Sequence, residues 1–248
     1  MSLSRFFLPA SDWSSGLLHG EEAEHAVRVL RKGVGDKIEL FDGVGNVAVA
    51  EITAAQKASL AFRIDSTQHY QRDGVPVHLI VALIKAQAFE WLLEKAVELG
   101  AASIQPVITD HCVVQLDADQ AGKKLTKWRR LMLESAKQCH TPFLPELFDP
   151  IRWDAAMKLG ESNSVNYIAA LDDAKQSIPN QLGIDAAGCR PACVRLAIGP
   201  EGDFTKEEMD MARRSGFRFI TLGPLILRAE TAAIAGLAVL THEARKVV

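Results

Sequence analysis

Two short segments near the C-terminus combine glycine, proline and charged residues in a pattern that suits ligand binding. Gly199–Phe204 (GPEGDF) follows the apolar run 193–198, and Leu222–Thr231 (LGPLILRAET) leads into a second apolar segment. Glycine lets a ligand approach the backbone and proline fixes the loop, so both segments can hold a ligand through amide and carbonyl groups. Tight structural turns have the same composition, and the pattern alone leaves that alternative open.

The charge of the first loop argues against a phosphate ligand. Glu201 places a carboxylate inside the loop, where it would repel phosphate. The chain also lacks the GxxxxGK[ST] and GxGxxG patterns of phosphate-binding loops. A ligand with a cationic or neutral polar head therefore fits this loop better.

The second loop carries Arg228 and Glu230 where it enters the last apolar segment. Charged side chains beside an apolar helix are costly to bury unless they are paired. We therefore expect these two residues either to pair with each other or to act in function.

The elements that must position these loops alternate between short apolar runs and helical segments. Runs of this kind predict a parallel sheet that helices cover on both faces. Ligands of such sheets bind outside the carboxyl ends of the strands, so the two loops and the segment 171–173 are expected to lie together. The predicted strands are Val77–Ile84, Ile104–Ile108, Tyr167–Leu171, Cys193–Ile198 and Phe219–Leu222.

Three helices can be read from the same region. Apolar spacing predicts one over Phe89–Leu99, ended by Gly100. Thr205 and Glu208 form a capping-box pattern, which predicts a helix from about Lys206 to near Gly216. The last helix, from about Thr231, is apolar all round, which predicts burial, and a subunit interface is a reasonable place for it.

Residues 1–72 predict a separate, β-rich unit. Two strand-like runs, 37–41 and 46–52, flank an Asp-Gly turn, and a third run covers 59–64. A helix is expected over Glu21–Lys32, stopped by Gly33. Linker composition around residues 71–76 sets the predicted domains at 1–72 and 73–248.

The composition of the chain limits the classes of protein to which it can belong. The chain has 248 residues, of which 48% are hydrophobic and 24% charged, with a net charge of -3. It has no apolar stretch long enough for a membrane span and no signal peptide, so a cytoplasmic protein is expected. The four cysteines have no metal-type spacing, and no metal is predicted.

The quoted loops and several other segments resemble the RsmE family of 16S rRNA uridine-N3 methyltransferases, within the SPOUT superfamily. IGPEGDF and LGPLILRAETAAIAGL carry the resemblance most specifically. RFFLP, HAVRVLRKGVGD, LFDG and EKAVELGAASIQPV match in the same order, so it covers nearly the whole chain.

The resemblance implies a fold and partners that spacing does not show. The fold would be α/β: a SPOUT-type domain with a trefoil knot in its mainly parallel sheet, plus a small N-terminal PUA-like β-barrel that holds RNA. The protein would be a homodimer acting on small-subunit rRNA, free or within an assembled or assembling subunit. The cofactor would be S-adenosylmethionine, bent in the knot. Its implied contacts are Ala170, Leu171, Ile198, Gly199, Pro200, Glu201, Gly202, Leu222, Gly223, Ile226, Leu227, Thr231 and Ala232.

The implied reaction assigns roles to three charged residues. Uridine N3 carries a proton at neutral pH, so it must lose that proton or have its developing charge stabilised. Arg228 can stabilise negative charge on the base, and Glu230 or Glu201 can accept the proton or hold Arg228. Glu230 also suits a helix N-terminus electrostatically, so both roles stay open for it.

RNA contacts are expected from basic side chains of both domains, and the family pattern is not fully kept near them. The expected RNA-binding residues are Arg5, His25, Arg28, Arg31, Lys32 and Lys85. The chain departs from the family at Ala86-Gln87-Ala88, at Cys139-His140-Thr141-Pro142, at Leu225 and at Asp203, and three of these departures remove positive charge. Two alternatives therefore stay open: methylation of another RNA position, such as a ribose hydroxyl, and a non-catalytic RNA-binding or ribosome-assembly protein.

Overall fold

The computed structural model describes residues 3–114, 118–160, 163–171, 176–177 and 191–245. The chain divides into two compact units. The first is Met1–Arg72 with Leu133–Leu144, and the second is Asp73–Met132 with Pro145–Val248. Within the described ranges, no helix is long and apolar enough to cross a bilayer.

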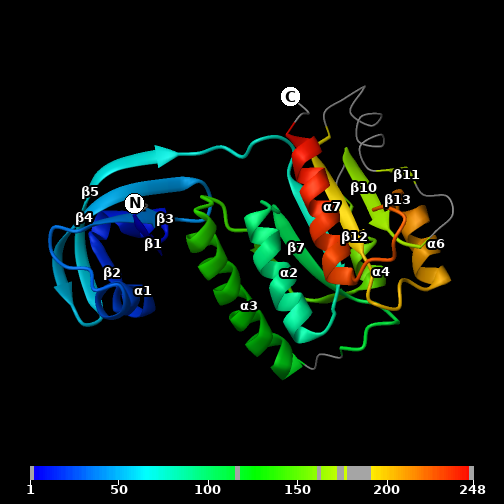
Figure 1. Ribbon diagram of the computed structural model, residues 1–248, viewed down its shortest axis with the longest axis horizontal. Helices are drawn as coiled ribbons and strands as arrows, with labels where there is room; N and C mark the ends of the chain where they lie inside the picture. Colours follow the sequence, from blue (N-terminus) through cyan, green and yellow to red (C-terminus); the bar gives the residue numbers. More distant parts are fainter. Residues whose placement is uncertain (1–2, 115–117, 161–162, 172–175, 178–190, 246–248) are drawn as a thin grey trace. The chain divides into compact units, whose positions relative to one another are not determined.

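The first unit is built on a curled five-stranded sheet with the order β1-β3-β4-β5-β2 (Figure 1). The predicted hairpin is confirmed, because β3 pairs antiparallel with β4. The second and third strands are longer than predicted, and β4 and β5 slip register twice where they pair, which is typical of a bent sheet. The strands are β1 (Ser4–Phe7), β2 (Leu17–His19), β3 (Lys37–Phe41), β4 (Asn46–Gln56) and β5 (Ser59–His69).

The predicted helix of this unit ends earlier than expected. A 3-10 helix, η1 (Ala10–Ser15), comes first, followed by α1 (Gly20–Glu24), which continues as a π-helical turn, η2 (His25–Val29). Leu30 N–H still donates to His25, and Arg31 then takes a left-handed conformation with φ 53°. The chain therefore leaves the helix before Gly33, which had been predicted to stop it.

The second unit holds a sheet with the order β11-β13-β10-β12-β6-β7-β8, with β9 paired to β7. All pairings that the structure describes in this sheet are parallel, as predicted. The strands are β6 (Val77–Ala82), β7 (Ser103–Ile108), β8 (Glu146–Leu147), β9 (Ile151–Arg152), β10 (Ser164–Ala169), β11 (Gln176–Ser177), β12 (Cys193–Ile198) and β13 (Phe217–Thr221).

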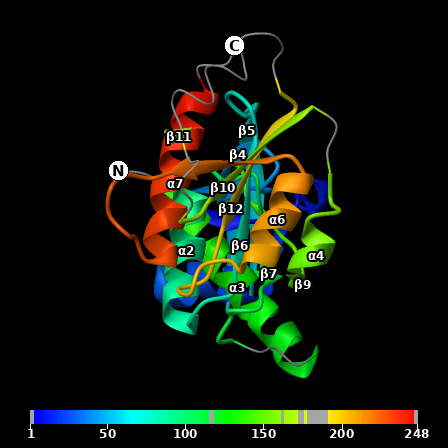
Figure 2. The same ribbon diagram turned by 90° about the vertical axis from the view of Figure 1, so that its right-hand side faces the viewer.

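Helices cover both faces of this sheet, as predicted (Figure 2). One face carries α2 (Ala86–Glu98) and α7 (Ala229–Ala244), and the other carries α4 (Trp153–Ala156) and α6 (Lys206–Arg214). The helix α3 (Ala118–Cys139) packs on α2, with the rings of Trp128 and Phe89 4.6 Å apart. The trefoil knot stays a prediction.

Two of the predicted helix starts were late by a few residues. α2 begins at Ala86 rather than Phe89, and α7 begins at Ala229 rather than Thr231. The predicted capping box of α6 is confirmed, with both the Thr205 and the Glu208 side chains in place. α7 is buried along one side only, and Val239 is among its exposed residues.

Candidate functional site

The three predicted loops follow strands whose ends lie in register. Ala169, the last residue of β10, pairs with Ile198 of β12 on one side and with Ile220 of β13 on the other. Three neighbouring parallel strands therefore end at one edge of the sheet, and the segments that follow them meet there.

A cavity of about 190 Å³ lies at this edge. Its walls are strand ends, loop backbone and aliphatic side chains, with two carboxylates. It is lined by Ala169, Ala170, Leu171, Ile198, Gly199, Pro200, Glu201, Asp203, Ile220, Thr221, Leu222, Gly223, Pro224, Leu225, Ile226, Leu227, Ala229 and Ala232.

Of the predicted cofactor contacts, Gly202 and Thr231 do not line the cavity, and all the others do. Sequence reasoning missed several lining residues. Ala169, Ile220 and Thr221 were missed because they belong to the strand ends. Asp203 and Leu225, which depart from the family pattern, also line the cavity, and the signal that could have identified Asp203 is a carboxylate within a ligand-type loop. Asp172 and Asp173 lie outside the described residues.

The charge of the cavity fits a cationic ligand. Among the described residues that line it, the charged ones are Glu201 and Asp203, and no Lys, Arg or His side chain contributes. Negative charge without a basic partner would repel phosphate and attract a sulfonium or ammonium group. Aliphatic walls suit the flat, weakly polar parts of a nucleoside. These residues therefore fit S-adenosylmethionine.

The first glycine of the GPEGDF loop serves packing. A Cβ on Gly199 would lie 3.0 Å from two ring carbons of Phe204. Phe204 is 3% exposed and its ring contacts that of Trp153, with centroids 4.5 Å apart. Gly199 thus lets the loop turn over a buried aromatic anchor, whereas a Cβ on Gly223 would meet only open space.

Asp203 connects two of the loops. Its backbone is left-handed, with φ 58°, a conformation that Asp tolerates better than most residues. Its Oδ2 accepts a hydrogen bond from the Leu171 amide at 2.8 Å, and its Oδ1 accepts one from the Phe204 amide at 2.8 Å.

His111 approaches the same loop from the segment after β7. Its Nδ1 lies 2.9 Å from the Gly202 carbonyl oxygen and 2.9 Å from that of Asp203. Because carbonyls only accept, Nδ1 must carry a proton. The Asp203 carbonyl, helped by nearby carboxylates of Glu208 and Asp110, raises the pKa of His111 above its ordinary value of 6.5.

The predicted catalytic residues lie at and beside the cavity. Glu201 lines it and is exposed. Arg228 is the exposed N-cap residue of α7, and Glu230 lies half-buried in the first turn of that helix. Both come directly after lining residues, and within the described part of the chain no ion pair joins them. The sequence predicts that Arg228 and Glu230 either pair with each other or act in function, and the structure does not show the pairing.

The predicted RNA-binding residues are divided between the two units. In the first unit, Arg28 and Arg31 are exposed, while His25 and Lys32 are partly buried. Arg28 lies 3.9 Å from Glu24, a long and exposed ion pair that leaves it free to bind elsewhere. Lys85 is exposed in the second unit, at the N-terminus of α2.

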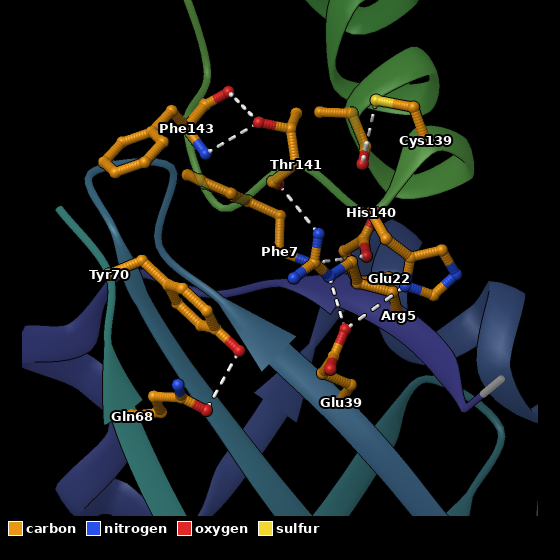
Figure 3. A network of polar contacts seen from close by, with 11 residues as sticks. Arg5, Phe7, Glu22, Glu39, Gln68, Tyr70, Cys139, His140, Thr141 and Phe143 are labelled. Atoms are coloured by element: carbon orange, nitrogen blue, oxygen red, sulfur yellow. Dashed lines mark hydrogen bonds and ion pairs between the residues drawn. The ribbon is translucent and has the colours of Figure 1, made fainter. Parts of the chain in front are cut away.

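Arg5 does not fit its predicted role. It is 7% exposed; its Nε lies 2.6 Å from the Glu39 carboxylate, and its NH1 donates to the Thr141 carbonyl at 2.7 Å (Figure 3). His140 also faces Glu39, at 3.4 Å. Arg5 thus fastens the segment after α3 to the sheet of the first unit, and its buried guanidinium is not exposed for contact with RNA.

A second ion pair joins the end of α3 to α1. Lys137, 8% exposed, lies 2.9 Å from Glu22 and 2.8 Å from Glu134. The segment Leu133–Leu144 therefore belongs to the first unit through buried charge contacts as well as packing. Sequence order alone placed it in the predicted domain 73–248.

Comparison with known proteins agrees with this geometry. Residues 71–241 match the family model described as an RNA methyltransferase domain, and residues 18–65 match an RNA methyltransferase PUA domain. The ribosomal RNA small subunit methyltransferase E of Bacillus subtilis is 27% identical over 90% of this chain and 88% of its own. The protein of that name from Synechocystis is 30% identical over 85% of this chain and 67% of its own.

Solved structures give the same relationship. A Legionella pneumophila protein named as a methyltransferase, in complex with the bound cofactor SAM, has 30% identity and a TM-score of 0.85, covering 98% of both chains. The ribosomal RNA small subunit methyltransferase E of Neisseria gonorrhoeae, bound to S-adenosyl methionine, has 29% identity and a TM-score of 0.84, covering 96% of this chain and 97% of its own. The chain therefore belongs to the RsmE family of RNA methyltransferases.

Proposed function

We propose that this protein transfers a methyl group from S-adenosylmethionine to N3 of a uridine in 16S ribosomal RNA. The observation that carries the proposal is the cavity at the carboxyl ends of β10, β12 and β13, which has carboxylates and no basic side chain among its described lining residues. Relatives and structural neighbours that are named as small-subunit rRNA methyltransferases, one of them with the cofactor bound, support the same assignment.

The loops around the cavity would hold the cofactor mainly through their backbone. Gly223 has φ 129° and nothing within 4 Å of the place that a Cβ would take, so a ligand can approach its Cα. Its amide donates to Thr221 Oγ1 at 3.2 Å and its carbonyl accepts from that hydroxyl at 2.9 Å, which holds the turn in shape. Leu171 and Leu227, which line the cavity, would offer aliphatic walls to the cofactor, and the Glu201 carboxylate would attract its positive charge. The bound cofactor supplies an activated methyl group on its sulfonium, so the protein has mainly to align the base for an in-line transfer.

The residues at the start of α7 would act on the base. Arg228 can stabilise the negative charge that develops on the uracil carbonyls. Glu230 and Glu201 are the two candidate acceptors of the N3 proton. Arg228 is held by no described ion pair, which suits a group that pairs with substrate charge instead.

RNA would be held by the exposed basic side chains Arg28, Arg31 and Lys85, with the partly buried Lys32 and His25. Such contacts fix the register of the RNA, while the pocket selects the base. A second copy of the chain is the proposed partner for the exposed apolar residues Leu225 and Ile226, at 76% and 79% exposure. A cytoplasmic location follows from the ribosomal substrate.

The test has two stages. Calorimetry with the purified protein and S-adenosylmethionine should show binding, and the cofactor should raise the melting temperature by mass action. Mass spectrometry of 16S rRNA nucleosides should then show 3-methyluridine in cells that have the protein and less in cells that lack it. A change in a ribose-methylated nucleoside instead would assign another target. Absence of S-adenosylmethionine binding to the purified protein would refute the methyltransferase assignment.

A further inference from the structure

We propose that Asp203 and His111 are positioning residues of the cofactor cavity: Asp203 ties the loop after β12 to the segment after β10, and His111 holds the backbone that presents Asp203. The identity of the ligand in this proposal rests on the proposed function. The contacts themselves come from the geometry of three chain segments that are distant in sequence.

The first link is the Asp203 carboxylate. Leu171 lies two residues beyond the end of β10, where strand pairing no longer holds the chain. Its amide donates to Asp203 Oδ2 at 2.8 Å, across 32 residues of sequence. Leu171 and Asp203 both line the cavity, so this bond sets the spacing of two of its walls.

The second link holds Asp203 itself. The Phe204 amide donates to Oδ1 at 2.8 Å, and the buried Phe204 ring anchors that end of the loop. His111 donates from Nδ1 to the carbonyls of Gly202 and Asp203, both at 2.9 Å. A Cβ on Gly202 would lie 3.2 Å from the His111 Cβ, so the two segments are in close contact.

The third link fixes His111. The neighbouring Asp110 amide donates to Glu208 Oε1 at 2.9 Å, and Glu208 is 3% exposed at the start of α6. The Cys112 amide donates to the Thr109 carbonyl at 3.1 Å, which closes a turn around His111. The buried Glu208 carboxylate therefore holds the segment that carries His111, and His111 in turn holds the GPEGDF loop.

Such supports matter most for a site made of loop backbone. Loops that are held in the binding conformation before the ligand arrives do not have to be ordered by it, which raises affinity. Asp203 accepts from one exposed amide, that of Leu171, and from one partly buried amide, that of Phe204. Loss of both hydrogen bonds costs roughly a 10- to 100-fold change in an equilibrium constant. We expect that change to appear in cofactor binding.

The variants Asp203→Gly and Asp203→Asn separate this role from a purely structural one. Glycine removes both acceptor oxygens but adopts the left-handed backbone more easily, so the ligand-free protein should melt at the same temperature or higher. Its Kd for S-adenosylmethionine, measured by calorimetry, should rise roughly 10- to 100-fold. Asparagine keeps one acceptor and should give an intermediate Kd. Asp210→Asn, which changes an exposed ion pair with Arg213 on α6, is the matched control and should bind like the unchanged protein.

His111 is tested by His111→Ala and His111→Gln. Alanine removes the donor and should weaken cofactor binding, while glutamine keeps a side-chain N–H and should restore part of the affinity. Unchanged Kd in Asp203→Gly, or a lower melting temperature without a change in Kd, would overturn the proposal. If the unchanged protein does not bind S-adenosylmethionine, the proposed function fails instead, so the two failures can be told apart.

Discussion

Gly199 lies directly against the ring of Phe204, so that the space a Cβ would need is already taken by two ring carbons at 3.0 Å. Phe204 is buried against Trp153 beneath the same loop. The glycine that the sequence marks as a ligand-binding residue is therefore required first by the packing that shapes the loop.

Gly199→Ala should consequently destabilise the protein and disturb the cavity. Overpacking a close contact costs typically about 1–3 kcal/mol in the free energy of unfolding. Thermal denaturation should show a lower melting temperature, and the Kd for S-adenosylmethionine should rise. Gly122→Ala is the control, because Gly122 is exposed on α3 with nothing near its missing Cβ. That change should be neutral or stabilising. Equal melting temperatures for the two variants would contradict the packing role.

Glu208→Ala should be strongly destabilising for a different reason. The buried Glu208 carboxylate accepts from the Thr205 amide and from the Asp110 amide, both at 2.9 Å. Its removal leaves two amides without an acceptor, which costs about 1–3 kcal/mol for each that stays buried. Chemical denaturation should show the loss. Glu207→Ala, one residue earlier on the same helix and exposed, should change the free energy of unfolding by less than about 0.5 kcal/mol.

Arg5→Ala and Arg28→Ala should separate stability from RNA binding. Arg5 is buried against Glu39, and removing one partner of a buried pair costs about 3–5 kcal/mol. Arg28 is exposed, so its loss should leave the melting temperature unchanged and lower the salt dependence of binding to small ribosomal subunits from cells that lack the protein. A stable Arg5→Ala protein with weakened RNA binding would restore Arg5 to the RNA surface.

Arg228→Ala should lower turnover far more than cofactor affinity. Removing one preorganised group that stabilises developing charge typically costs about 10²–10³ in kcat. Methyl transfer from labelled S-adenosylmethionine to unmodified small subunits gives kcat, and calorimetry gives the cofactor Kd. Thr241→Ala, at the other end of α7, is a control that leaves the cavity untouched. Equal losses of turnover and affinity in Arg228→Ala would indicate a structural role.

The support that His111 gives the loop should weaken as the pH rises. Its pKa is raised above 6.5 by the Asp203 and Gly202 carbonyls and by the carboxylates of Glu208 and Asp110. The stabilising contribution of the charged ring is therefore complete below 6.5 and is lost as the pH passes the raised value. Because the ring is exposed, the effect is small, and the neutral ring can still donate from Nδ1.

The difference in melting temperature between the unchanged protein and His111→Gln should accordingly shrink from pH 6 to pH 9, since glutamine does not titrate. A difference that stays constant over this range would show that protonation of His111 has no part in holding the loop.

Local patterns in the sequence were sufficient for the longer strands and for several helices of the second unit. The prediction was wrong in the bounds of β10, which is Ser164–Ala169 rather than Tyr167–Leu171, and it did not include the short elements β8, β9, β11 and α4. Cys193–Ile198 forms β12 with the predicted ends, because a continuously apolar run has to be buried on both sides. The capping box at Thr205 and Glu208 joins residues three apart, so it can be read directly from the sequence. The glycine-proline loops could be placed at the carboxyl ends of strands because they follow apolar runs directly in the sequence.

The tertiary structure decided which charged residues support the fold and which remain exposed. The sequence places Arg5 among basic residues of an RNA-binding type, yet its partners are Glu39 and the Thr141 carbonyl, the latter 136 residues away. Asp203 bonds to Leu171 across 32 residues, and His111 contacts its carbonyl across 92. Hydrogen bonds of this kind depend on where folding brings distant segments together. The sequence alone therefore determined the main strands and helices of the second unit and the loops between them, and the packed chain determined how the cavity between those loops is held.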